Sequence, residues 1–392
     1  MGVRFSARTG WNTEESAFAA AIRAERSSDR TLYDLTISNP TVCGFQYDAE
    51  AVLGPLNNSK SLMYDPDPRG MLRAREAVCR YYSEHRAELS PDALVLTTST
   101  SEGYGYLFRL LCDAGDEVLV AQPSYPLFDF LADLKDVRLK PYPLFYDYGW
   151  WIDFAALERQ ISPRTRAIVV VHPNNPTGHG TRAAERHRLE ELCARHGLAL
   201  IVDEVFLDYS LDRPDTEPLV SFAVGPHPVL TFVLTGMSKI AALPQMKAAW
   251  IATFGPEAAR REAMSRLEVI ADTFLSMNAP VQLALPVWLE GRKGIQRQIL
   301  DRVRENLAQV EQSGVEALRV EAGWCAILRL PQSHGSDEIA GSLLKECGII
   351  IHPGSFYGIS EAGRVVASLI GPAEEFAAGM ARIAAYTVEP QG

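Results

Sequence analysis

The sequence predicts an α/β fold in which a mostly parallel, doubly wound sheet is joined to a smaller α+β unit. Short apolar runs rich in valine, isoleucine and leucine alternate with helix-like stretches from about residue 93 to residue 253. Such runs are typical of strands buried on both faces, and their alternation with helices is typical of open parallel sheets. The runs cover residues 94–98, 117–121, 167–171, 198–202, 229–234 and 248–253.

Helical patterns connect and flank these runs. Residues 181–197 end in His-Gly, which is a common way for a helix to end. Residues 12–27 form a predicted amphipathic helix with Asn12 as its cap. Long helical patterns also cover about 256–276 and 288–313.

The C-terminal part follows an α+β pattern instead. After residue 313, short strand-like segments alternate with a helical stretch, and the chain ends in a further helix. We therefore expect a large α/β domain of residues 46–285 that binds the ligand. A small α+β domain of residues 286–392 should follow, with the N-terminal segment 1–45 packing on it.

Composition excludes several classes of protein. The 392 residues carry a net charge of −11 and no basic field, so neither nucleic acid nor an anionic membrane is an expected partner. No apolar run reaches the roughly 18 residues of a membrane helix, and the N-terminus lacks the apolar stretch of a secretory signal. The six cysteines form no CxxC pair, so we expect reduced thiols, no metal site and a cytoplasmic location.

Polar residues follow the predicted strands where a ligand would bind, because open parallel sheets bind ligands at the carboxyl ends of their strands. Ser99, Thr100 and Ser101 open a helix after the first run. Hydroxyls and backbone N–H groups at such a helix start suit a phosphate. Taken alone, they are more typical of an ordinary helix cap than of a phosphate site.

Four later strands end in other reactive or aromatic groups. Tyr125 lies between prolines, Asn175 lies in a turn stiffened by prolines, Asp203 directly follows a buried run, and Lys239 follows a turn of small residues. Each has an ordinary structural explanation: a packed turn residue, turn chemistry, a helix cap or a surface lysine. Together they place an anion cradle, an aromatic ring, an amide, a carboxylate and an amine on one rim.

This combination matches the needs of pyridoxal phosphate (PLP). The cofactor requires a lysine to form a Schiff base. Its pyridine nitrogen requires an acidic partner, so that the protonated ring can act as an electron sink. Its phosphate requires an anion site, and its ring requires a flat surface. The sequence therefore predicts PLP as the cofactor.

The chain resembles the fold-type I PLP-dependent enzymes of the class I/II aminotransferase family. The resemblance spans nearly the whole length, and the order and spacing of its motifs are highly specific. The motifs are YDPDPRG (64–70), AGDEVLVAQPSYP (114–126), HPNNPTG (172–178), VDEVF (202–206), SKIAALPQMKAAW (238–250) and PGSFYG (353–358), followed by Arg364.

The resemblance implies a role for each cofactor-site residue. Lys239 resembles the Schiff-base lysine, Asp203 the partner of the pyridinium nitrogen, Asn175 the donor to the cofactor O3′, and Tyr125 the ring-stacking aromatic. The residues of the predicted phosphate end are Ser99, Thr100, Ser101, Ser238 and Lys247.

The resemblance also implies partners. Tyr64 resembles the residue that reaches the phosphate of the neighbouring subunit, which predicts a homodimer with shared active sites. Arg364 resembles the arginine that binds the substrate α-carboxylate, and Asn39 and Asn175 lie where substrate contacts are expected. The other expected partners are small molecules, an amino acid and a 2-oxo acid.

Three positions depart from the family pattern. Lys247 stands where many members have an arginine, so the charge is kept but the planar fork is lost. Phe206 stands where many members have a tyrosine that also donates to O3′, so one donor is missing. The segment at Asn39 lacks the glycine often found there, which can narrow the substrate pocket.

The predicted function is transamination between an L-α-amino acid and a 2-oxo acid by a ping-pong mechanism. The alternative is a lyase, cyclase or oxidase that acts on an amino acid through the same carbanion. A ligand sensor with an aminotransferase-like domain is disfavoured, because the segment before Tyr64 is too short and insufficiently basic for a DNA-binding domain. The sequence does not identify the donor or acceptor, although Trp324, Phe356 and Tyr357 are candidates for lining an apolar pocket.

Overall fold

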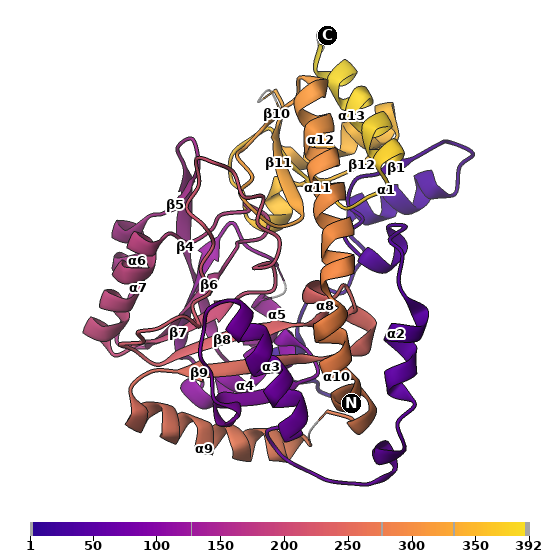
Figure 1. Cartoon of the computed structure of the whole chain (residues 1–392). Coiled ribbons are helices and arrows are strands. Elements are labelled where there is room, and N and C mark those ends of the chain that lie inside the picture. Colours follow the sequence, from indigo (N-terminus) through magenta and orange to yellow (C-terminus); the bar gives the residue numbers. More distant parts are fainter. Residues whose placement is uncertain (1–2, 127, 276, 332–333, 389–392) are drawn as a thin grey trace.

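A central sheet dominates the computed structural model, which describes residues 3–126, 128–275, 277–331 and 334–388 (Figure 1). Within these residues the sheet has eight strands. Their order across the sheet is β2 (Leu94–Thr97), β9 (Ala249–Phe254), β8 (Thr231–Gly236), β7 (Ala199–Asp203), β6 (Thr165–Val171), β3 (Glu117–Gln122), β4 (Arg138–Tyr146) and β5 (Trp150–Ile152). Only β9 and β5 run antiparallel to their neighbours. The predicted mostly parallel α/β sheet is thus confirmed.

All six predicted runs are strands, but β4 and β5 were not predicted. Pro141 and Pro143 interrupt the apolar pattern of β4 and supply no N–H group to a strand partner. β4 nevertheless pairs in parallel with β3 over six residues, with Pro141 opposite Val120 and Pro143 opposite Gln122. Sheet pairing therefore overrides a local pattern that disfavours a strand.

Helices cover both faces of the sheet, because successive strand residues point to opposite sides. Leu94, Leu96 and Leu200 belong to one apolar cluster, while Val95 and Ile201 belong to the other. The first cluster includes residues of α3 (Leu72–Glu84), α6 (Phe154–Gln160), α7 (Ala183–His196) and α10 (Ala279–Gly291). The second includes residues of α4 (Thr100–Leu111), α5 (Phe128–Asp133) and α9 (Glu257–Phe274).

A second group of elements from the C-terminal part of the chain packs around its own apolar cluster at one end of the molecule (Figure 1). Its antiparallel sheet has the order β10 (Glu316–Ala317), β11 (Cys325–Arg329), β14 (Arg364–Ser368) and β13 (His352–Pro353). Its helices are α11 (Lys293–Ser313), α12 (Ser336–Ser342) and α13 (Ala373–Val388), with a π-helical turn at Leu343–Cys347.

The N-terminal segment contacts both parts of the molecule. β1 (Tyr33–Asp34) pairs in parallel with β12 (Ile349–Ile350) of the C-terminal group. Earlier in the chain, the Trp11 ring lies edge-on to Phe130 and its Nε1–H donates to Asp133 of α5 at 2.8 Å. The predicted division at residues 285 and 286 falls inside α10 and stays a prediction.

Two of the predicted helices differ from those in the structure: one begins later than expected, and the other is divided into two helices. α1 covers Ala17–Arg26, and its cap is Ser16, which accepts from the N–H of Ala19 at 3.1 Å. The predicted cap, Asn12, instead accepts from the N–H of Glu14 in a separate turn. The single helix predicted over 288–313 is two helices, α10 and α11, which meet at Arg292.

The remaining elements are short. They are α2 (Ala49–Leu53), α8 (Met237–Ile240) and the 3-10 turns Ala7–Thr9, Pro40–Val42, Gly54–Leu56, Ser59–Leu62, Pro91–Ala93, Pro244–Met246 and Gly354–Tyr357. None of the described helices combines the length and the apolar character needed to cross a bilayer.

Candidate active site

A cavity of about 320 Å³, called here the main cavity, lies at the carboxyl edge of the central sheet. Its lining contains ten of the residues singled out from the sequence: Ser99, Thr100, Ser101, Tyr125, Asn175, Asp203, Phe206, Ser238, Lys239 and Lys247. The other lining residues are Ser38, Tyr104, Phe128, Leu131, Val171, Val205, Gly236, Ala249, Trp324, Cys325 and Tyr357.

The sheet topology explains why these distant residues meet. Tyr125, Asn175, Asp203 and Lys239 follow or end β3, β6, β7 and β8, which are parallel neighbours and therefore finish at the same edge. β9 runs in the opposite direction, with Ala249 opposite Gly236. Because β9 begins at this edge, Lys247, two residues before Ala249, is brought to the same rim.

The start of α4 presents hydroxyl groups to the main cavity. Ser99 caps the helix by accepting from the N–H of Glu102 at 3.1 Å. Glu102 in turn accepts from the N–H and the hydroxyl of Thr98. No hydrogen bond of the Thr100 or Ser101 hydroxyl is found in the described part of the chain, so both remain available to an anion.

A tight turn after β6 holds Asn175 in place. The N–H of Gly178 donates to Asn174 O at 2.8 Å, and the Thr177 hydroxyl donates to Asn174 Oδ1 at the same distance. Gly178 has a φ of +68°, and an added Cβ would lie 2.6 Å from Ala322 O, so the turn requires glycine here. Asn175 Oδ1 is buried without a hydrogen-bond partner within the described residues.

Asp203 is a buried carboxylate, and only 7% of its surface is exposed. Its Oδ1 accepts from the N–H of Val205 at 3.1 Å, and its Oδ2 accepts from the Tyr104 hydroxyl at 3.2 Å. Burial raises the pKa of Asp203 to about 6, against the lowering effect of these hydrogen bonds and of the Lys239 charge. Asp203 forms no ion pair within the described residues, so a cation bound beside it would relieve the cost of burial.

Lys239 lies in an aromatic corner of the main cavity. Its Nζ is 5.2 Å from the ring centroid of Trp324 and 5.8 Å from that of Phe206. Its backbone carbonyl accepts from the Tyr209 hydroxyl at 2.6 Å, which fixes the turn that carries it. Burial lowers the pKa of Lys239, against the opposing effects of Cys325 and Asp203. A lowered pKa favours the neutral amine, which is the nucleophilic form.

Three predicted site residues do not line the main cavity. The side chain of Asn39 is exposed and accepts from both the N–H and the hydroxyl of Thr41, while its neighbour Ser38 lines the cavity. Tyr64 is 81% exposed. Arg364 is buried at the start of β14, where its Nη1 donates to Ala362 O at 3.3 Å.

Sequence reasoning missed two residues of the site, Tyr104 and Cys325, and gave Trp324 no specific position in it. Tyr104 lies one helical turn after Thr100, so the helical spacing itself places it on the same face of α4. Trp324 was proposed only as a pocket aromatic, and its position beside Lys239 could not be foreseen. Cys325 was grouped with the buried thiols, and burial raises its pKa to about 12.

The donor set of the main cavity fits PLP. The amine of Lys239, the buried carboxylate of Asp203 without an ion-pair partner in the described residues and the side-chain amide of Asn175, whose NH2 group can donate, lie in one cavity with the hydroxyls of Thr100 and Ser101. These groups correspond to the aldehyde, the pyridine nitrogen, the phenolic oxygen and the phosphate of the cofactor.

Comparison with known proteins agrees with this chemistry. The family model "Aminotransferase class I and II" matches residues 46–383. The chain is 26% identical over 276 residues to the glutamate-pyruvate aminotransferase AlaA of Escherichia coli strain K12, covering 70% of this chain and 67% of that protein. It is 30% identical over 287 residues to an alanine aminotransferase of Mycobacterium tuberculosis strain H37Rv, covering 71% and 65% of the two chains.

Solved structures show the same fold. An alanine aminotransferase from Pyrococcus furiosus superposes with a TM-score of 0.88 at 21% identity, covering 99% of this chain and all of that one. An aspartate aminotransferase from Thermotoga maritima superposes with a TM-score of 0.84 at 20% identity, covering 97% and 99%. With the family match over most of its length, this chain belongs to the class I and II aminotransferases and is a PLP-dependent enzyme with the fold-type I architecture.

Proposed function

We propose that the main cavity transfers an amino group between an L-α-amino acid and a 2-oxo acid, with Lys239 and Asp203 as its central groups. The observation that carries this proposal is that both side chains line one buried cavity although they follow different strands. When bound there, PLP supplies an electron sink for the electron pair left at the substrate Cα.

Lys239, Asp203 and Tyr104 have separate roles in this proposal. Lys239 would hold the cofactor through its amine, and the freed amine would move a proton away from the substrate Cα. Asp203 keeps the ring nitrogen protonated through a charge-assisted hydrogen bond. Tyr104, which donates to the other carboxylate oxygen, orients Asp203 for this bond.

The phenolic oxygen and the ring face have separate partners. We assign Asn175 as the donor to the phenolic oxygen and Tyr125 as the aromatic that covers one face of the ring. The Phe206 ring has no hydrogen-bonding group, but it packs edge-on against the Trp324 ring, with 5.3 Å between the ring centroids. It thereby helps to form the aromatic corner around the Lys239 amine.

The phosphate end combines hydroxyls with a cation. We assign Ser99, Thr100, Ser101 and Ser238 to the phosphate oxygens, together with the N–H groups at the start of α4. Lys247 supplies a positive charge from the start of β9, as a point charge without the paired donors of an arginine.

The substrate carboxylate needs a positive partner, and Arg364 stays the predicted one. No ion pair of Arg364 is found within the described residues, so its charge is available to an anion. It does not line the main cavity. Among the relatives, printed names include glutamate-pyruvate, alanine and tyrosine aminotransferases. This spread does not single out one donor.

A homodimer would account for an exposed apolar segment. Leu62, Met63 and Tyr64 are 90%, 72% and 81% exposed, which is unusual for three consecutive apolar residues. We propose that this segment contacts a second copy of the chain, where Tyr64 reaches the neighbouring phosphate site. The free thiols of Cys43, Cys79, Cys112, Cys193 and Cys325 fit a reducing compartment such as the cytoplasm.

Mixing two inactive variants tests the shared site. Neither Lys239→Ala nor Tyr64→Ala dimers should contain an intact site, but a hybrid dimer should contain one. Random mixing of equal amounts should therefore restore about a quarter of the wild-type activity. A chain that sediments as a monomer, or a mixture that stays inactive, would contradict the shared site.

A half-reaction with the amino donor alone tests the reaction type. Transamination should release one equivalent of 2-oxo acid per active site, change the cofactor absorbance and then stop until a second 2-oxo acid is added. Continuous release of ammonia or of a cyclised product would show that the alternative chemistry, elimination, cyclisation or oxidation, is the correct one.

A further inference from the structure

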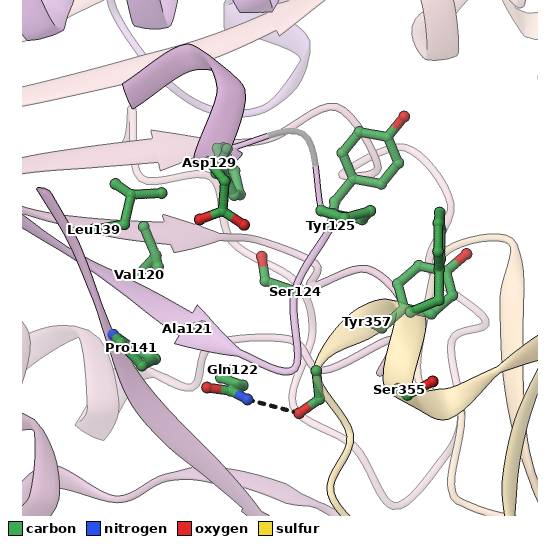
Figure 2. A pocket seen from close by; sticks show the side chains of 14 residues that line it. Val120, Ala121, Gln122, Ser124, Tyr125, Asp129, Leu139, Pro141, Ser355 and Tyr357 are labelled. Atoms are coloured by element: carbon green, nitrogen blue, oxygen red, sulfur yellow. Dashed lines mark hydrogen bonds between the residues drawn. The ribbon is translucent and has the colours of Figure 1, made fainter. Parts of the chain in front are cut away.

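A second cavity of about 300 Å³, called here the side cavity, lies next to the main cavity (Figure 2). It lies at the end of β3 and beside the first half of β4, and it is bordered by the start of α5 and by the Gly354–Tyr357 turn. Its lining residues are Val120, Ala121, Gln122, Ser124, Tyr125, Pro126, Phe128, Asp129, Leu139, Pro141, Ser355, Phe356, Tyr357 and Gly358.

The side cavity shares an aromatic wall with the main cavity. Tyr125, Phe128 and Tyr357 line both cavities. Tyr357 is held by a hydrogen bond between its hydroxyl and His352 Nδ1 at 3.2 Å. Aromatic faces pack well against the aliphatic stem of a long side chain and also attract a cationic end.

Asp129 is the single charged residue among those that line the side cavity. It remains accessible to solvent and forms no hydrogen bond or ion pair within the described residues. Burial, and after it the neighbouring Asp133 carboxylate, raises the pKa of Asp129. A cation beside Asp129 would oppose both effects.

Two further polar groups face the same space. The hydroxyl of Ser124 is buried without a hydrogen-bond partner within the described residues. Figure 2 shows this hydroxyl and the Asp129 carboxylate directed toward one another across the side cavity. Gln122 donates from Nε2 to Gly358 O at 2.8 Å, which fixes its amide and leaves its carbonyl oxygen as an acceptor.

The side cavity offers two acceptor groups to a ligand, the Asp129 carboxylate and the Gln122 carbonyl oxygen, beside the Ser124 hydroxyl, which can donate as well as accept. A carboxylate and an amide oxygen suit a ligand group that carries several N–H donors and a positive charge. A carboxylate-bearing side chain would be repelled by Asp129, and a purely apolar one would leave Asp129 and Ser124 without partners.

We propose that the side cavity receives the distal end of the substrate side chain, and that Asp129 selects amino acids whose side chain ends in a positively charged nitrogen. The inference rests on the proposed function, because it takes the main cavity as the place where the substrate amino group reacts. It assigns Asp129 to substrate specificity and gives it no part in the chemical step.

Arginine and citrulline form a matched pair of donors, because they differ in a guanidinium against a neutral ureido group of nearly the same shape. The wild-type enzyme should show a higher kcat/KM for arginine. Asp129→Asn should lower the ratio of the two kcat/KM values about 10- to 100-fold, which is the usual effect of losing a charge-assisted hydrogen bond. The control is Asp272→Asn, which removes the same charge from an exposed position on α9 that does not line the side cavity, and it should leave this ratio as it is.

A binding measurement separates this proposal from the proposed reaction. The probes are 5-guanidinopentanoate and 5-ureidopentanoate, which lack the α-amino group and cannot react. Titrated into the holoenzyme by calorimetry, the guanidino compound should bind at least about 10-fold more tightly, and Asp129→Asn should remove this preference. Equal binding of the two probes, or a preference that survives Asp129→Asn, would overturn the subsite. An enzyme that shows the preference but transaminates no amino acid would overturn the proposed function alone.

Discussion

Replacing Lys239 with alanine should abolish transamination and remove the absorbance band of the covalently bound cofactor. Among the residues lining the main cavity, the only other amine is that of Lys247, which the proposal assigns to the phosphate. Without the Lys239 amine, neither the covalent bond nor the proton transfer at the substrate Cα has a group to carry it. We expect kcat to fall by at least about 10⁴-fold, as measured in steady state and by half-reaction spectra.

The matched control is Lys345→Ala, which removes a lysine in the π-helical turn of the C-terminal group, away from the main cavity. This variant should keep the absorbance band and full activity. A Lys239→Ala protein that folds, retains the band and still turns over would move the covalent role to another residue.

Replacing Asp203 with asparagine should cause the second-largest loss. The amide keeps the size of the side chain and can still accept from Tyr104, but it cannot pair with a protonated ring nitrogen. The electron sink is then weakened, and we expect kcat to fall by about 10²- to 10⁴-fold, with the protein still folded. Absorbance spectra and single-turnover rates with a saturating donor would measure the effect.

Glu204 provides the control for this variant, because it is the adjacent buried carboxyl but does not line the main cavity. It accepts from the Ser221 hydroxyl at 2.7 Å and from the N–H of Phe222. Glu204→Gln should therefore affect stability more than the cofactor spectrum. Equal spectral changes in both variants would contradict the special pairing of Asp203 with the ring nitrogen.

The pH dependence of cofactor binding follows from the same residue. Burial raises the pKa of Asp203 to about 6, and pairing with a cationic ring favours the ionised carboxylate. Cofactor affinity should thus weaken as the pH falls below about 6, where the free carboxyl takes up a proton. In Asp203→Asn this component of the pH dependence should be absent.

Short-range patterns were sufficient to locate the rim of the main cavity. A strand buried on both faces is apolar throughout, and the first polar residue after it marks the strand end, which is why the amino-acid pattern could place Asp203. Lys239 follows its apolar run after a short turn of small residues. The strand β4 was missed because its own sequence pattern does not indicate a strand. Its pairing depends on β3, whereas its own sequence, with Pro141 and Pro143, disfavours a strand.

Residues whose position depends on tertiary contacts could not be placed from the sequence alone. The substrate contact of Asn39 stays a prediction; its side-chain oxygen accepts from the N–H and the hydroxyl of Thr41 and so caps its own turn. Trp324 lies beside Lys239 only because the C-terminal group, far along the chain, packs against the central sheet. Asp129 carried no sequence signal, since a lone acid at the start of a helix is common.

Reduction of the holoenzyme with borohydride, followed by peptide mapping, tests the central claim most directly. Borohydride fixes the cofactor permanently to the amine that carries it, so the label reports the attachment site independently of turnover. We expect the label to reside on the peptide containing Lys239 and to be lost in Lys239→Ala. A label on Lys247 or on a lysine outside the main cavity, or a wild-type protein that takes up no cofactor, would contradict the assignment of Lys239.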